Sequence, residues 1–262
     1  MGSYSEEAIK VLENTNVVKK EIKRKHPFRN FLIVVCILGI IIYIMSTPFF
    51  DIKTIRVKGN HYYSEKQVIT LSDAKTGVNI FWAAGDSKIR NRLEKDPYFE
   101  DVSIRRRLPS TLLIKVEERK QIAAVEYGDQ YVVIDPSGVV LRTGKIDPKL
   151  TLISGLKIRE MKKGEKLKVK QSKSFAKTLK MLEAMEKGDI FFKKTTFEEG
   201  KDANIRAYIL DNLVVRGKPE YVMKRLKSGD LQKVVNNLVQ KGNAMGTIYI
   251  DENNFITFSP DI

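Results

Sequence analysis

The side chains that most often catalyse reactions or bind metals are few in this chain, and their spacing fits neither task. The two histidines, His26 and His61, lie far apart, and the one cysteine, Cys36, lies inside an apolar run. A structural zinc site needs about four clustered Cys or His ligands, and neither a Gly-x-Ser-x-Gly elbow nor a His-Glu-x-x-His motif occurs. A glycosidase pair of carboxylates is an arrangement that the sequence leaves open. We predict no catalytic residue, no metal ligand and no cofactor, and hence a protein that is not an enzyme.

The residues best suited to binding lie at the C-terminal end of the sequence. Alternation over Thr247–Asp251 and Phe255–Phe258 predicts a terminal hairpin. The last strand of a chain often lies at the edge of a sheet, where its unpaired backbone N–H and C=O groups can bind a strand of another chain. Phe255 and Phe258 would point to different faces of this hairpin, with Tyr249 across from them. The alternative is that these aromatic rings complete the core, and from the residues alone we favour that alternative.

Basic residues form the second candidate binding surface. The formal net charge is +15, of which residues 1–30 contribute +3 and the rest of the chain +12. Such a charge concentrates anionic partners near the protein but says little about its fold. Arg105–Arg107 either keeps a strand edge solvated or faces acidic lipid or protein. The lysines of residues 162–173 either form a solvated loop or contact an anionic wall polymer. They are Lys162, Lys163, Lys166, Lys168, Lys170 and Lys173.

One apolar segment is long enough to cross a membrane. Phe31–Met45 carries no charge and apolar character resumes at Phe49–Phe50, so a helix over 31–50 would span about 30 Å, the thickness of a bilayer core. Basic residues crowd its N-terminal side, which the positive-inside rule places in the cytoplasm. The alternatives are a cleaved signal peptide, a lipoprotein anchor and a buried core helix. The lack of an Ala-x-Ala-like cleavage site and the mid-segment position of Cys36 disfavour the first two.

The sequence after this segment predicts two α+β modules. From 51 to 119 the order is strand, helix, helix, strand, strand, in which two helices can cover one face of a three-stranded sheet. Ser64–Gln67 forms a capping box, which opens a helix with Val68, Ile69 and Leu71 on its buried face.

The second module is predicted from hairpins, helices and the terminal strand pair. Turn residues at Asp135–Gly138 and Asp211–Asn212 predict two hairpins, and an apolar stripe predicts a helix over Ser172–Lys187. We expect a mostly antiparallel sheet here. The predicted fold is therefore α+β, with a single N-terminal transmembrane helix. The predicted domains are 1–30 (basic cytoplasmic tail), 31–50 (transmembrane helix), 51–119 (first module) and 120–262 (second module).

Two runs of residues resemble the FtsQ/DivIB family of bacterial division proteins. The first, FDIKTIRVKGNHYYSEKQVI, resembles the start of a POTRA domain directly behind a single anchor. The second, DPYFEDVSIRRRLPSTLLIKVEERKQIAAV, has the family's order of a hydrophobic residue, basic residues, Leu-Pro and an alternating strand that ends in Val-Glu-Glu-Arg. The resemblance implies a POTRA domain (β-α-α-β-β) at 51–119 and the family's β domain at 120–262.

The resemblance also implies a function and a set of partners. A member of this family would be a non-enzymatic division scaffold of the cell membrane, type II in topology and located at the septum, which helps to regulate septal peptidoglycan synthesis. Its partners would be DivIC/FtsB-like and FtsL-like bitopic proteins and septal synthases, and no nucleic acid. In the family the last strands of the β domain receive the C-terminal part of the FtsB/DivIC partner. This implies partner contacts at Tyr249, Phe255, Ile256 and Phe258 and reverses the preference for a core role. Arg216 matches the family's strand-end region and is either a partner contact or a structural residue.

Two other functions stay open at this stage. One is an adaptor that binds anionic wall polymer or the membrane through its basic face. The other is a bitopic wall hydrolase with paired carboxylates in a cleft.

Overall fold

The structure, a computed structural model, divides into two compact units, Met1–Pro48 and Phe49–Ile262. In the first unit, helix α2 (Pro27–Met45) has a mean hydropathy of 2.4 and is long and apolar enough to cross a membrane. At 1.5 Å per residue it would span about 28 Å. The predicted cytoplasmic tail falls mostly outside the described residues. The described residues are 27–82, 84–198 (without the side chains of 186 and 187), 204–253 and 255–261.

The apolar helix ends before the predicted membrane segment does. After α2, Pro48–Phe50 forms a short 3-10 helix, η1. Because proline removes a backbone donor and clashes with the preceding turn, it does not continue an α-helix. The Phe50 ring lies 5.2 Å from the ring of Phe81, centroid to centroid, and packs against a buried cluster of the second unit. Phe50 therefore contributes to the core that follows the helix.

A three-stranded sheet with two helices on one face begins the second unit. Strand β1 pairs with β3 in parallel and β2 pairs with β3 in antiparallel fashion, in the order β1-β3-β2. The order of elements along the chain is the predicted one. The elements are β1 (Thr54–Lys58), α3 (Glu65–Ser72), α4 (Asp86–Leu93), β2 (Phe99–Arg107) and β3 (Thr111–Glu118).

Helix α3 begins at the predicted capping box. The Ser64 hydroxyl accepts from the backbone N–H of Gln67 at 3.3 Å, and the Gln67 side-chain oxygen accepts from the backbone N–H of Ser64 at 2.9 Å. The buried face is narrower than predicted. Val68 is fully buried, but Leu71 is 41% exposed and Ser72 is buried in its place. Val68 and Ser72 are four residues apart and so share one face, which is all that a helix of eight residues buries here.

The turn after β1 is fixed by one glycine and one carboxylate. Gly59 has a φ of +87°, and a Cβ there would overlap the carbonyl oxygen of Val116. Directly after it, the Glu118 carboxylate accepts the backbone N–H groups of residues 61–63, at 2.6 Å from His61 and 3.2 Å from Tyr63. The Val-Glu-Glu-Arg run thus includes a carboxylate that holds this turn.

A nine-stranded mixed sheet forms the rest of the second unit, in the order β14-β13-β12-β11-β10-β7-β4-β5-β6. The pairs β4–β7, β7–β10 and β12–β13 are parallel and the other five are antiparallel, so the sheet is mixed but mostly antiparallel, as predicted. The strands are β4 (Ala123–Tyr127), β5 (Gln130–Ile134), β6 (Val140–Gly144), β7 (Thr151–Ser154), β10 (Lys194–Phe197), β11 (Ile205–Leu210), β12 (Leu213–Gly217), β13 (Gly246–Ile250) and β14 (Ile256–Pro260). Strands β8 (Ile158–Glu160) and β9 (Lys168–Val169) form a separate pair.

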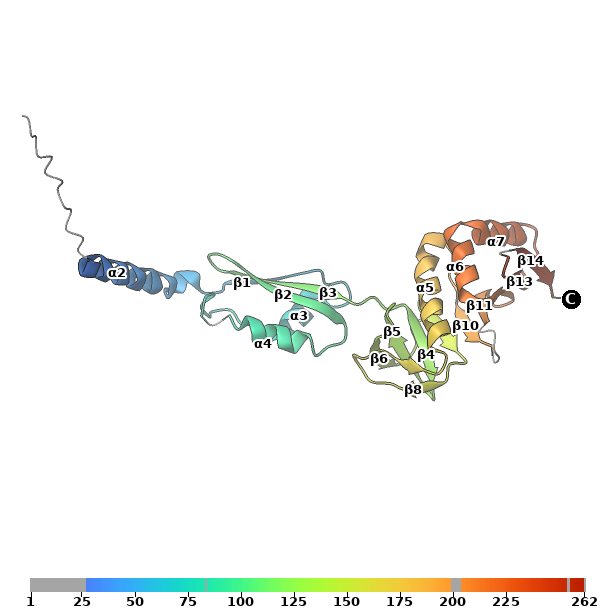
Figure 1. The fold of residues 1–262 in the computed structure, drawn as a ribbon, viewed down its shortest axis with the longest axis horizontal. Coiled ribbons are helices and arrows are strands. Elements are labelled where there is room, and N and C mark those ends of the chain that lie inside the picture. The colour runs from blue at the N-terminus through green and yellow to red at the C-terminus, as the bar shows by residue number, and fades with distance from the viewer. Residues whose placement is uncertain (1–26, 83, 199–203, 254, 262) are drawn as a thin grey trace, which may run out of the picture. The chain divides into compact units, whose positions relative to one another are not determined.

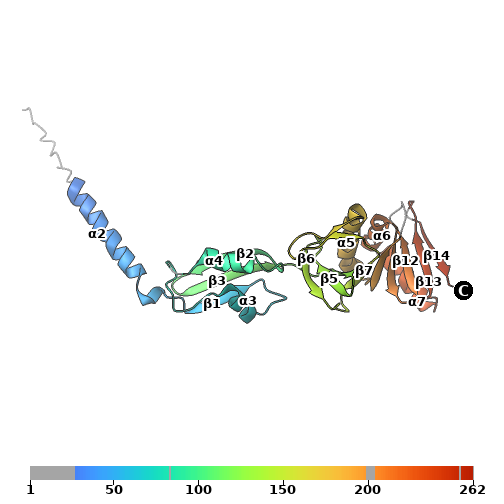
Figure 2. The same cartoon turned by 90° about the horizontal axis from the view of Figure 1, so that it is seen from below.

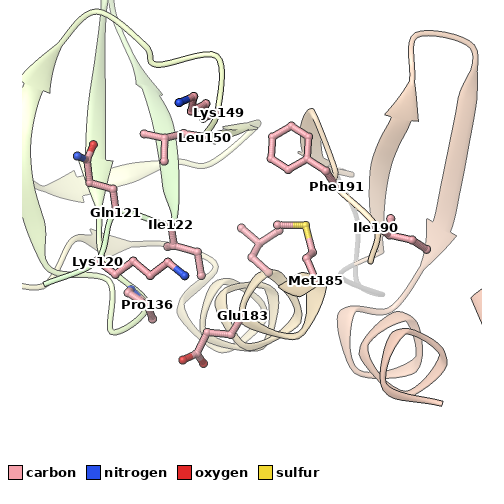
Figure 3. A pocket seen from close by; sticks show the side chains of 11 residues that line it. Lys120, Gln121, Ile122, Pro136, Lys149, Leu150, Glu183, Met185, Ile190 and Phe191 are labelled. Carbon is pink, nitrogen blue, oxygen red and sulfur yellow. The ribbon is translucent and has the colours of Figure 1, made fainter. Parts of the chain in front are cut away.

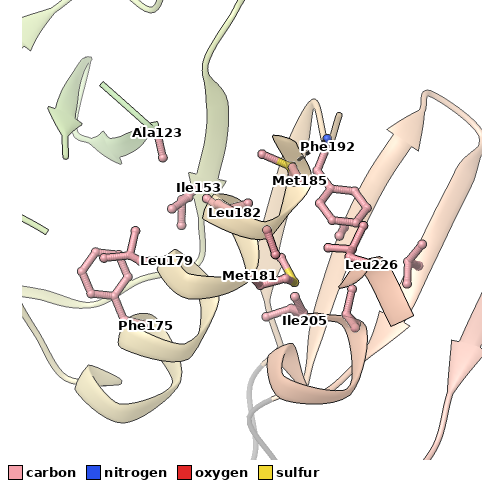
Figure 4. Close-up of a cluster of buried hydrophobic side chains, with 14 of the residues drawn as sticks. Ala123, Ile153, Phe175, Leu179, Met181, Leu182, Met185, Phe192, Ile205 and Leu226 are labelled. Atoms are coloured by element: carbon pink, nitrogen blue, oxygen red, sulfur yellow. Dashed lines mark hydrogen bonds between the residues drawn. The ribbon is translucent and has the colours of Figure 1, made fainter. Parts of the chain in front are cut away.

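Three helices cover one face of this sheet, as Figures 1 and 2 show. They are α5 (Ser172–Gly188), α6 (Pro219–Lys227) and α7 (Asp230–Gln240). Figure 4 shows α5 in the middle of the core: Leu179 points toward Ala123 and Ile153, while Met185 lies near Phe192 on the other side. One helix therefore joins the two halves of the sheet into one core.

Truncation of Phe192 should destabilise this core far more than truncation of its neighbour. Phe192 is fully buried and Phe191 is 41% exposed. We expect Phe192→Ala to lower the free energy of unfolding by about 3–5 kcal/mol, because it leaves a cavity, and Phe191→Ala to change it by less than about 1 kcal/mol. Urea unfolding of the full chain in detergent, followed by circular dichroism, measures both. Equal losses for the two variants would contradict the packing described here.

Candidate functional site

The nine-stranded sheet has two edges, and among the described residues another segment pairs with the β6 edge at its first residue and with the β14 edge nowhere. At the β6 edge, the backbone N–H of Val140 donates to the Glu165 carbonyl at 2.9 Å, and the N–H of Gly164 donates to the Val140 carbonyl at 2.8 Å. At the other edge, β14 pairs with β13 on one side, and no described segment pairs with it on the other. Unpaired edge groups can bind an added strand.

The hydrogen-bond pattern identifies which groups of β14 face outward. The N–H of Asp251 donates to the Phe255 carbonyl at 3.3 Å, and the N–H of Asp261 donates to the Met245 carbonyl at 3.5 Å. Hydrogen-bonded pairs alternate along an antiparallel ladder, so in the register of this hairpin residues 257 and 259 direct their backbone groups toward β13. Ile256, Phe258 and Pro260 direct theirs outward. Proline has no N–H, so the outward donors end at Phe258.

The predicted contact residues divide between the two faces of the terminal hairpin. Ile256 and Phe258 lie on the helix-covered face, half-buried against the core cluster. Phe255 precedes β14 and is 67% exposed, and Tyr249 lies on the open face of β13 with 40% exposure. The core role therefore applies in part to Ile256 and Phe258, whereas Phe255 and Tyr249 are open to solvent.

Arg216 and Tyr249 lie together on the open face. The register aligns Arg216 of β12, Tyr249 of β13 and Thr257 of β14 in one row across three strands. The Arg216 guanidinium carbon is 5.9 Å from the centroid of the Tyr249 ring, within the range of a cation–π contact. Thr257 is small, so a side chain from an added strand can reach the Tyr249 ring across it.

Glu198 holds this row in place and was not found from the sequence. Its carboxylate accepts from Nε of Arg206 at 2.7 Å and from Nε of Arg216 at 2.9 Å. Burial raises the pKa of Glu198, but the hydrogen bonds from Arg216 and Arg206 outweigh burial and hold its pKa below the ordinary value of 4.5. Arg206 and Arg216 are cross-strand neighbours because the register of the hairpin shifts between Tyr208 and Leu210. The sequence did not predict this shift, and nothing local in the sequence marks Glu198.

Two pockets offer further space for ligand groups. A depression of about 250 Å³ at the ends of β12 and β13 is lined by Arg216 and Tyr249 together with Tyr221. A second pocket, of about 330 Å³, lies beside α5; Figure 3 shows Lys120 on one wall and Met185 on the helix. Its other lining residues are Gln121, Ile122, Pro136, Lys149, Leu150, Leu182, Glu183, Ile190 and Phe191.

The two pockets differ in their acidic side chains, since Asp251 and Glu252 line the depression at the ends of β12 and β13. Among the described residues that line the pocket of Figure 3, Glu183 is the one carboxylate, so this pocket lacks the pair that a glycosidase uses. In the described ranges no group of three or more His, Cys, Asp or Glu side chains could hold a metal ion. The site offers backbone hydrogen-bonding groups, the Arg216 guanidinium and exposed aromatic rings, with the Asp251 and Glu252 carboxylates in the neighbouring depression.

Comparison with known proteins finds similarity to bacterial cell-division proteins. Residues 50–119 match the description "POTRA domain, FtsQ-type". The chain is 27% identical over 209 residues to the cell division protein DivIB of Clostridium acetobutylicum, covering 79% of this chain and 82% of that protein. It is 30% identical over 142 residues to DivIB of Bacillus subtilis (strain 168), covering 53% of this chain and 54% of that protein.

The chain contains an FtsQ-type POTRA domain and is similar along most of its length to cell-division proteins named DivIB. This similarity supports a role in cell division, and with the apolar N-terminal helix it indicates a membrane-anchored division protein. The predicted α+β fold, with a POTRA domain followed by a β-rich region, is confirmed. The extracytoplasmic domain of DivIB from Geobacillus stearothermophilus (trans isomer) is also similar, at 13% identity and a TM-score of 0.31, covering 47% of this chain and 97% of that one.

Removal of the Glu198 charge should destabilise the protein in a pH-dependent way. A carboxyl whose pKa is lowered by folding stabilises the protein above its ordinary pKa, and that stabilisation is lost as the pH falls through the lowered value. We expect Glu198→Gln to reduce the free energy of unfolding by about 1 kcal/mol at neutral pH. The difference in the free energy of unfolding between wild type and Glu198→Gln should shrink as the pH falls below 4.5, the ordinary pKa of the glutamate carboxyl.

Urea unfolding at a series of pH values measures this difference. Asp211→Asn is the control, because the Asp211 carboxylate is 89% exposed and pairs with Lys193 at 3.2 Å on the surface. A difference between wild type and Glu198→Gln that stays constant down to acidic pH would show that the charge of Glu198 does not stabilise the row.

Proposed function

We propose that this protein is a non-enzymatic, single-pass division scaffold of the FtsQ/DivIB family, whose strand β14 receives an extended segment of a DivIC/FtsB-like partner. The observation that carries the proposal is the outward orientation of the Ile256 and Phe258 backbone groups at an edge that no described residue covers. These two residues offer two donors and two acceptors in the pattern of a strand. An added strand pairs with them in the way that β13 pairs with the inner side of β14.

Affinity and specificity would come from different parts of this surface. Each backbone hydrogen bond contributes about 1 kcal/mol net, so the ladder provides sequence-independent affinity. The row of Tyr249 and Arg216 on the open face supports selection for a partner with aromatic or acidic side chains near the ladder. The exposed ring of Phe255 extends the apolar contact at one end, and Pro260 limits the ladder at the other.

The anchor defines where this scaffold acts. In the proposed topology α2 spans the cell membrane with the basic N-terminal tail (residues 1–30) in the cytoplasm, and the POTRA domain (51–119) and the β domain (120–262) lie outside at the septum. Through the DivIC/FtsB-like protein and an FtsL-like protein, the chain would recruit septal synthases and help to regulate peptidoglycan synthesis. Recruitment of this kind needs docking surfaces and no turnover.

Loss of one outward donor should weaken partner capture without unfolding the hairpin. Ile256→Pro removes the outward N–H of residue 256, and proline is tolerated on an edge strand where its N–H would face solvent. We expect capture of a DivIC-like partner by the full chain to fall about tenfold, as one lost hydrogen bond and the steric effect of the ring predict. Ile256→Val keeps the donor and a β-branched side chain, so it should bind like wild type.

Co-purification from detergent-solubilised membranes measures capture, and circular dichroism checks that both variants fold. Equal capture by Ile256→Pro and Ile256→Val would remove β14 from the interface. Salt separates this function from an anionic-polymer adaptor: a strand ladder persists at high ionic strength, whereas binding through exposed lysines and arginines is screened.

A further inference from the structure

One end of the POTRA domain carries three exposed apolar side chains. Phe49 is 60% exposed, Trp82 is 60% exposed and Leu108 is 59% exposed. They come from three separate segments: the start of the unit, the loop between α3 and α4, and the turn between β2 and β3. Large apolar side chains exposed together at one end of a domain mark an interaction site.

Backbone contacts hold these three segments together at the start of β1. The N–H of Ile80 donates to the carbonyl of Phe50 at 2.9 Å, which attaches the Trp82 loop to the residue after Phe49. The carbonyl of Ser110 accepts from the N–H of Lys53 at 2.8 Å. This hydrogen bond attaches the turn that contains Leu108 to the chain three residues after Phe50. Figure 2 shows this loop and this turn at the end of the domain where β1 begins.

The covalent chain keeps this end near the membrane whatever the orientation of the domain. Only three residues separate Phe49 from Met45, the last residue of α2. At no more than 3.6 Å per residue, Phe49 lies within about 14 Å of the end of the helix. If α2 spans the bilayer, this end of the domain is therefore confined to the layer next to the lipid head groups.

Arginine side chains surround the same end. Arg105 and Arg107 alternate on the open face of the sheet, where no helix covers them, and within the described part of the chain neither forms an ion pair. Arg56 lies in the same row as Arg105, with Leu113 of β3 between them. Leu113 is only 5% exposed on this uncovered face, as expected if the arginine stems cover it and their head groups reach outward. Arg106, on the other face, is paired with Asp86 at 2.7 Å.

We propose that this end of the POTRA domain binds the surface of an anionic phospholipid bilayer. Trp82 and Leu108 enter the interfacial layer, and the guanidinium groups of Arg105 and Arg107 contact lipid phosphates. The proposal rests on the proposed membrane anchoring and adds a second attachment, which restricts the directions in which the domain can point from its anchor. A lipid surface fits because tryptophan and arginine together favour the membrane interface, and each basic residue near an anionic surface adds to the attraction.

Trp82 is the one tryptophan of the chain, so its fluorescence reports on this contact alone. The full chain is reconstituted into vesicles of phosphatidylcholine, or of an equimolar mixture of phosphatidylcholine and phosphatidylglycerol, with and without brominated acyl chains. In the mixed vesicles we expect a blue-shifted emission, quenching by brominated lipid and protection from aqueous acrylamide. In phosphatidylcholine alone the emission should remain that of a tryptophan in water.

Variants test the roles of charge and apolar contact separately. Arg105→Gln with Arg107→Gln should lower the affinity of this end of the domain for the mixed vesicles about 30-fold, since each basic residue contributes about 1 kcal/mol at an anionic surface. Leu108→Ser should reduce the quenching without a change in charge. Lys163→Gln with Lys173→Gln removes the same charge from exposed positions elsewhere and should have no effect. Circular dichroism of each variant confirms its fold.

Three results would overturn the proposal: emission of a tryptophan in water in both kinds of vesicle, equal lipid quenching in both, or protection from acrylamide without lipid quenching. The last result would mean that a protein surface, such as a second copy of the chain, covers Trp82. Capture of the DivIC-like partner through β14 is measured on the same preparations. If lipid quenching is absent while the chain still captures the DivIC-like partner, this inference is wrong and the proposed scaffold function still holds.

Discussion

An open β-sheet always leaves two rows of backbone groups without partners, and this constraint shapes the C-terminal half of the protein. Here the row on β6 is met at its start by the segment around Glu165, while the row on β14 meets no described residue. Exposed edges invite pairing with other chains, and proteins usually block them. On β14 the blocking is partial: Pro260 removes one donor, but Ile256 and Phe258 keep theirs. A site that binds an extended segment needs this kind of opening.

The covered face of the sheet explains why the edge remains ordered without a partner. Ile256 and Phe258 place their side chains against the core beneath the helices, opposite Ile250 and Ile248, so packing holds the strand while its outward backbone groups stay available. At the start of β13, Gly246 lies so close to the backbone of Ser259 and Pro260 that a Cβ would collide with it. The hairpin is therefore held by close contact on one side and is open on the other.

Patterns that are local in sequence allowed the capping box at Ser64, the hairpin turns and the terminal strand pair to be predicted. Strands β7 and β10 were not predicted, because four residues are too few to show a period and their parallel partners lie far away in sequence. For the same reason the parallel pairs of the sheet were not predicted. At the candidate site, Tyr249 and Arg216 could be named from the sequence with the help of family resemblance. Glu198 could not, because its partners come from two other strands.

The most direct test of the account is amide hydrogen exchange along β14 in the full chain, with and without a DivIC-like partner. Without the partner, the amides of Thr257 and Ser259 should exchange slowly, because they face β13, and those of Ile256 and Phe258 should exchange fast. On binding, the amides of Ile256 and Phe258 should slow by about tenfold or more, which an added strand predicts. A partner that binds while these two amides exchange as before would contradict the account.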